Sequence, residues 1–215
     1  MFPLHDESAK HRKKPYFTII LIAINVLIFI FTFFSADFEN EIIWEYGAIP
    51  DQILEGKSLL TLITSMFLHG GVMHLVGNMW FLWVFGDNIE HHLGKIKYII
   101  FYFLTGIIAA LIHIYTIPAE YMNIPTIGAS GAISGILGGY AILFPKNRIR
   151  AFIWFYFRPI FFYVPAFIYV GIWFLYQLLY LGTPTMIAYM AHIGGFISGI
   201  ILIKLFKKRR KILKK

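Results

Sequence analysis

Six apolar stretches separated by short polar segments restrict this chain to one class of fold. An α-helix needs about 20 predominantly apolar residues to cross the hydrocarbon core of a bilayer, where only helices and closed barrels satisfy their backbone groups. The chain of 215 residues is 59% hydrophobic and only 14% charged, whereas a soluble domain carries about 25% charged residues. The sequence therefore predicts a single-domain, all-α membrane protein with several spans.

The spans are expected at about 16–35, 71–87, 98–117, 129–144, 161–181 and 186–206. Residues 59–70 are apolar but too short to cross, so we expect them to be interfacial or re-entrant. The first run is long for a signal peptide and no Ala-x-Ala-like site follows it, so we expect it to be retained. The predicted organisation is an N-terminal tail at 1–15, a helical domain at 16–206 and a basic tail at 207–215.

The charges predict an orientation. With six spans and both termini in the cytoplasm, Lys57 is the only one of the 19 Lys and Arg residues outside, as the positive-inside rule requires. The net charge of +8 comes mostly from residues beside the spans, which favours anionic lipid of the bilayer as the partner rather than nucleic acid. The chain has no cysteine, so disulfides and thiolate metal sites are excluded.

The fourth span opens with Gly128-Ala129-Ser130-Gly131. Gly128 permits a tight turn, and Gly131 leaves room around the hydroxyl of Ser130. This setting suits a nucleophile that a substrate backbone approaches closely. It also suits a helix start whose small residues serve packing alone.

His192 lies six residues into the sixth span, roughly 10 Å below the outer surface at ~1.5 Å per residue. Gly195 and Gly199 share its helix face, and small residues let helices approach closely in lipid. An ionisable side chain inside a span is usually functional, although a carbonyl or hydroxyl can satisfy it structurally. Ser130 enters from the same side, so the two residues are expected to share a depth.

His74 and Asn78 are four residues apart in the second span and therefore share a helix face. Both side chains can donate hydrogen bonds to a developing oxyanion, or they can tether the bundle. His69 is expected to order the 59–70 segment.

Together these residues resemble the rhomboid family of intramembrane serine proteases. The resemblance rests on the pattern Gly128-x-Ser130-Gly131, on Ala191-His192 followed by Gly194-Gly195-x-x-x-Gly199, on His74-x-x-x-Asn78 and on Gly86-Asp87-Asn88-Ile89-Glu90. It runs from about Ser58 to the end of the sixth span.

The resemblance implies a six-helix rhomboid bundle with Ser130 as nucleophile and His192 as general base. His74, Asn78 and the backbone N–H of Ser130 would line the oxyanion hole, and Glu90 would be a structural acid. Two features depart from the pattern. Ser134 stands where many members carry an aromatic residue beside the base, and Glu45 follows Trp44 where many carry arginine.

No acidic residue lies at the depth of His192, so a dyad is expected rather than a triad. The expected substrates are transmembrane proteins, cut where a helix frays near the outer leaflet, since helices within lipid keep their carbonyls bonded. The resemblance suggests single-span substrates that approach beside the fifth span. We expect no cofactor and no metal, and the chain fits a compact multi-pass enzyme of a prokaryotic cell membrane.

Other interpretations stay open at this point. The same fold serves a catalytically inactive rhomboid-like protein that binds transmembrane clients. A zinc site of His69, His74 and His192 is conceivable, although the metalloprotease pattern His-Glu-x-x-His is absent. A transporter is less favoured because the two halves show no internal repeat.

Overall fold

The computed structural model describes residues 1–7, 14–35, 41–183 and 187–206, and six helices of 14 to 22 residues dominate this part of the chain. They are α1 (Tyr16–Phe33), α5 (Val72–Leu93), α6 (Lys95–Thr116), α7 (Ser130–Leu143), α8 (Ala166–Leu179) and α9 (Tyr189–Phe206). The helices α1, α6 and α9 are long and apolar enough to cross a membrane, and α7 and α8 are shorter apolar helices. The prediction of a mostly helical membrane protein is confirmed; six spans and cytoplasmic termini stay predictions.

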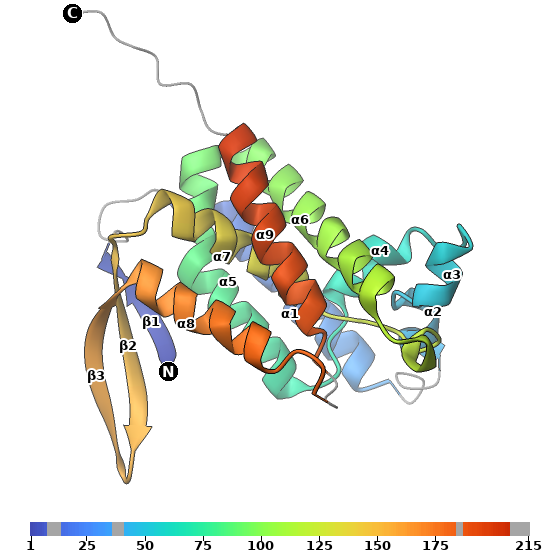
Figure 1. Ribbon diagram of the computed structural model, residues 1–215, viewed down its shortest axis with the longest axis horizontal. Coiled ribbons are helices and arrows are strands. Elements are labelled where there is room, and N and C mark those ends of the chain that lie inside the picture. The colour runs from blue at the N-terminus through green and yellow to red at the C-terminus, as the bar shows by residue number, and fades with distance from the viewer. Residues whose placement is uncertain (8–13, 36–40, 184–186, 207–215) are drawn as a thin grey trace, which may run out of the picture.

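The segment between α1 and α5 forms short helical turns on the side of the bundle away from the sheet (Figure 1). These are α2 (Ile43–Tyr46), α3 (Pro50–Leu54), α4 (Thr61–Thr64) and the 3₁₀ turn η3 (Ser65–Phe67). A second 3₁₀ turn, η4 (Ala119–Tyr121), follows α6. Residues 59–70 thus contain only short helices.

A three-stranded antiparallel sheet corrects the all-α prediction. Strand β2 (Arg148–Phe155) pairs with β1 (Phe2–Asp6) on one side and with β3 (Arg158–Pro165) on the other. In β2, Arg148 and Arg150 alternate with buried Ile149 and Ala151, and this period of two is the pattern of a half-buried strand. The predicted fifth span at 161–181 is therefore wrong at its start, because β3 occupies its first residues and α8 begins at Ala166.

The N-terminal segment is not simply the polar tail that the sequence predicted. Asp6 is 3% exposed, and its Oδ2 accepts hydrogen bonds from the Tyr140 hydroxyl at 2.8 Å and from Asn147 Nδ2 at 3.0 Å. The Trp80 indole N–H donates to the carbonyl of Pro3. These contacts hold β1 against α5 and the end of α7. Residues 8–13 of the predicted tail and the basic tail at 207–215 lie outside the described residues.

Glu90 anchors the start of α1. Its carboxylate accepts the backbone N–H groups of Phe17 at 3.1 Å and Thr18 at 2.8 Å, and the Thr18 hydroxyl at 2.9 Å. The first N–H groups of a helix lack intrahelical partners, so an acid here satisfies them and complements the helix dipole. The second span, predicted to end near residue 87 and to be separated from the third by a polar segment at 88–97, is correspondingly too short: α5 continues through Glu90 to Leu93, and Gly94 alone separates it from α6.

Helix α7 lies at the centre of the bundle, in contact with α5, α6 and α9 (Figure 1). Every residue from Gly131 to Tyr140 is buried. A Cβ atom at Gly195 of α9 would overlap the Gly131 carbonyl oxygen, and one at Gly138 would overlap that of Phe196. Backbone therefore meets backbone along the α7–α9 interface, as small residues permit.

Candidate active site

Ser130 is the first residue of α7 and follows a tightly held turn. Gly128 has φ of +116°, a conformation that strongly favours glycine, and its N–H donates to the Ser65 carbonyl at 2.8 Å. The residue before the helix is Ala129, whose side chain makes no capping hydrogen bond. Among the described residues, the N-cap position thus supplies no side-chain cap to the first N–H groups of α7, where an anion binds most favourably.

His192 lies in the first turn of α9, beside the start of α7. The carbonyl oxygen of Ala191 is 3.9 Å from the place that a Cβ atom of Gly131 would take. The neighbours of His192 and Ser130 in the chain therefore lie against each other, and both side chains are half-buried. Among the hydrogen bonds of the described residues, the Ser130 hydroxyl forms none with His192.

The imidazole of His192 is held from α8. Its Nδ1 lies 2.8 Å from Oε1 of Gln177. The ring of Trp173 lies 6.2 Å from the imidazole at an interplanar angle of 38°, and Tyr189 of α9 meets it edge-on at 6.4 Å. Ser134 instead donates its hydroxyl to the Ser130 carbonyl at 2.7 Å. The aromatic support that the sequence lacks at position 134 is thus supplied by Trp173 and Tyr189.

His74 and Asn78 reach the turn before Ser130 from the first two turns of α5. A Cβ atom at Gly128 would lie 2.7 Å from His74 Nε2 and 3.9 Å from Asn78 Nδ2. Asn78 Nδ2 donates to the His74 carbonyl at 3.0 Å. The two predicted oxyanion donors and the serine turn are therefore side by side.

The residues predicted to support the site structurally lie in three different parts of the molecule. His69 is fully buried, with its ring 5.0 Å from that of His74. Gly195 and Gly199 line the α7–α9 contact. Glu90 lies near the opposite end of α5 from His74 and serves α1 instead.

Gln177 is the residue that the sequence interpretation missed. It is 4% exposed in a helix whose other buried residues are Ala166, Tyr169 and Val170. The available signal was an amide inside an apolar span, because buried polar groups require hydrogen-bond partners.

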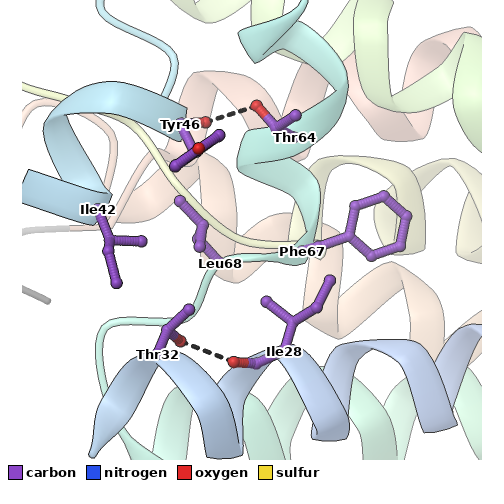
Figure 2. Close-up of a pocket in the computed structure, with 7 residues that line it drawn as sticks. All are labelled: Ile28, Thr32, Ile42, Tyr46, Thr64, Phe67 and Leu68. Atoms are coloured by element: carbon purple, nitrogen blue, oxygen red, sulfur yellow. Dashed lines mark hydrogen bonds between the residues drawn. The ribbon is translucent and has the colours of Figure 1, made fainter. Parts of the chain in front are cut away.

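An apolar pocket of about 280 Å³ opens on another part of the molecule, between α1, α2 and the 64–68 segment (Figure 2). Its lining residues are Ile28, Thr32, Ile42, Tyr46, Thr64, Phe67 and Leu68. None of them belongs to the predicted site. Within the described ranges, no group of three or more His, Cys, Asp or Glu side chains is placed to hold a metal ion.

A family model described as Rhomboid domain matches residues 56–209, which include every residue of this site. The chain belongs to the rhomboid family. It is 30% identical over 136 residues to the rhomboid protease GluP of Bacillus subtilis, covering 63% of this chain and 26% of the relative. It is 31% identical over 133 residues to the putative rhomboid protease YdcA of the same bacterium, covering 61% and 64%.

Rhomboid relatives from another compartment also match. Rhomboid protein 1, mitochondrial, of Saccharomyces cerevisiae is 30% identical over 153 residues, covering 67% of this chain and 41% of the relative. The chain thus spans less than two thirds of each of these rhomboid proteins. Because bacterial and mitochondrial members both match, a prokaryotic cell membrane stays a prediction for this one.

Proposed function

We propose that this rhomboid protein is an intramembrane serine endopeptidase that cleaves transmembrane segments near the outer leaflet through a Ser130–His192 dyad. The observation that carries the proposal is the meeting of α7 and α9, backbone against backbone, immediately beside both residues. Such a contact leaves little freedom for either helix start, which favours the preorganised geometry that nucleophilic catalysis needs.

In the proposed reaction, Ser130 Oγ attacks a substrate carbonyl while the free ring nitrogen of His192 takes the hydroxyl proton. The developing oxyanion is stabilised by the backbone N–H of Ser130 and by His74 and Asn78, which lie at the preceding turn. The protonated imidazole then gives its proton to the leaving amine, and water hydrolyses the acyl-enzyme.

The depth of the site favours a particular kind of substrate. With both termini cytoplasmic, the starts of α7 and α9 face the outer side, where water reaches the half-buried Ser130 and His192. A substrate helix must unwind before its carbonyl is attacked, and unwinding costs least where the helix leaves the hydrocarbon. We therefore propose transmembrane proteins in the surrounding bilayer as substrates.

A second candidate function has one observation in its favour. The Ser130 hydroxyl forms no hydrogen bond with His192 in the described part of the chain, and a rhomboid-like protein that binds transmembrane clients without cutting them would not need that bond. Apo sites often show such loose geometry, so chemistry must decide between the two candidates.

The test is labelling of the purified protein with a serine-reactive fluorophosphonate, together with cleavage of a reporter transmembrane segment in liposomes. We expect both in the wild type and neither in Ser130→Ala or His192→Ala. The control is Ser198→Ala, which removes a buried hydroxyl that donates to the Gly195 carbonyl at 2.8 Å. Cleavage that persists in pure Ser130→Ala would exclude the proposed dyad.

A further inference from the structure

The amide of Gln177 occupies an unusual position for a polar group. It lies in the last turn of α8 and is 4% exposed, while α8 is otherwise aliphatic and aromatic. Nearby, Phe174 stacks on Phe196 of α9 at 4.5 Å between ring centroids. An amide buried among such groups costs stability unless both of its ends are hydrogen-bonded.

Both ends of the Gln177 amide have partners, and one of them determines its orientation. Nε2 donates to the backbone carbonyl of Trp173, one helical turn earlier, at 3.0 Å. A carbonyl oxygen only accepts, so the nitrogen of the amide must face it. Oε1 of Gln177 must then face His192 Nδ1, which lies 2.8 Å away.

This orientation determines which ring nitrogen of His192 carries the proton. Oε1 is an acceptor, so Nδ1 must be the donor. A neutral imidazole with its proton on Nδ1 has its lone pair on Nε2. The ring thereby presents an unprotonated Nε2 as the only nitrogen free to accept the proton of a nucleophile.

We propose that Gln177 is a positioning residue that holds His192 as the Nδ1–H tautomer and fixes the direction of its Nε2 lone pair. The proposal rests on the proposed serine protease function. A carboxylate performs this task in serine protease triads, whereas here a neutral amide supplies the acceptor. When His192 takes the proton from Ser130 on Nε2, the Nδ1–H bond to Gln177 is kept and the amide gains no proton.

The inference explains two features of the sequence together. No acidic residue is needed at this depth, because the amide oxygen satisfies Nδ1. No aromatic residue is needed at Ser134 either, since Trp173, whose carbonyl orients Gln177, also places its ring against His192. Both supports come from one turn of α8.

The first test reads the tautomer directly. In protein labelled with ¹⁵N-histidine, the chemical shifts of His192, assigned by comparison with His192→Ala, should report a protonated Nδ1 and a free Nε2. Gln177→Leu should convert this spectrum to a mixture of the two tautomers. A wild-type His192 protonated on Nε2 would overturn the inference, whether or not the protein cleaves anything.

The second test is kinetic. We expect Gln177→Leu to lower kcat about tenfold with KM changed less than about twofold, since a single hydrogen bond to a neutral group is lost. Gln177→Glu keeps an acceptor, so its kcat should be close to that of the wild type. Its pH–rate profile should have the acidic limb at higher pH, because a carboxylate favours the protonated ring. Equal kcat values for Gln177→Leu and the wild type would overturn the inference.

The matched control is Phe174→Leu, which loosens the α8–α9 packing but leaves the acceptor in place. It should keep both the His192 spectrum and the pH profile, whereas a purely structural role of Gln177 predicts that both variants behave alike. A wild type that neither cleaves nor reacts with fluorophosphonate would instead overturn the proposed function, and the spectrum would still report separately whether Gln177 holds the tautomer.

Discussion

Gly199 of α9 lies so close to Gly135 of α7 that a Cβ atom on Gly199 would overlap the Gly135 carbonyl oxygen. The obstacle is backbone inside two packed helices, so no rotamer change can relieve it. The distance between α7, which begins at Ser130, and α9, which carries His192 in its first turn, depends on the missing side chain.

Gly199→Ala should therefore destabilise the protein by about 2 kcal/mol or more, the usual cost of overpacking a rigid site. The measurement is the midpoint of thermal unfolding in detergent. Gly77→Ala is the control, because Gly77 also lies within a helix but has no heavy atom within 4 Å of its Cβ position. Equal midpoints for the two variants would contradict the close backbone contact.

Asn78→Ala should lower kcat about 100-fold while the protein stays folded, because loss of one oxyanion donor costs about that factor. Asn25 of α1 is the matched control. It is also buried, and its Nδ2 donates to the carbonyl four residues earlier, Leu21, as that of Asn78 does to His74. Asn25→Ala should lose stability without losing turnover per folded molecule; a comparable loss of kcat in both would remove Asn78 from the oxyanion hole.

Gly128→Ala should abolish fluorophosphonate labelling of Ser130. The new methyl group would be strained at φ of +116° and would lie 2.7 Å from His74 Nε2, so it would displace a donor and the serine turn together. Gly56→Ala carries the strain alone, since Gly56 has φ of +76° and open space around its Cβ position. Labelling should persist in that control, and labelling that persists in both variants would refute the proximity of His74 to the turn.

Asp6→Ala should release the N-terminal strand from the bundle. The substitution removes the acceptor of the Tyr140 hydroxyl. A hydrogen bond to a charged group contributes about 1.5–3 kcal/mol to stability. Hydrogen–deuterium exchange should accelerate in β1 and in the facing edge of β2, with the centre of α7 unchanged. Glu7→Ala removes the neighbouring exposed acid and should leave exchange as it is; equal protection in both would mean that β1 is held by its strand pairing alone.

The sequence was a good guide to the helices and a poor one to the ends and partners of several of them. Apolar runs between polar segments located all six long helices, because the need for apolar side chains in lipid outweighs the intrinsic helix propensity of each residue. They did not reveal the strands around Arg148 and Arg158, where aromatic residues suit a membrane interface and a β-hairpin equally well. Nor did they show that α5 continues past Glu90, because an acid looks like a turn residue until its partners in α1 are known.

For the candidate site, residue types and spacing predicted that Ser130 and His192 share a depth and that His74 and Asn78 share a helix face, whereas the dyad itself was implied by the resemblance to rhomboid proteases. Spacing could not identify what holds His192, because Gln177 comes from a different helix and the bond depends on where α8 lies. One amide in an apolar helix marks a polar contact, but it does not reveal the partner.

The bonds from Glu90 to the start of α1 join residues 72 and 73 positions apart. When α1 has just been synthesised, Glu90, whose carboxylate binds the first N–H groups of α1, has not yet been synthesised. The first helix must enter the bilayer with its first backbone N–H groups bound to water. Glu90 can bind them only after α5 has emerged from the ribosome. Nascent chains that stop before Glu90 should thus contain an inserted α1 that is still free to shift, whereas chains a few dozen residues longer should hold it in place.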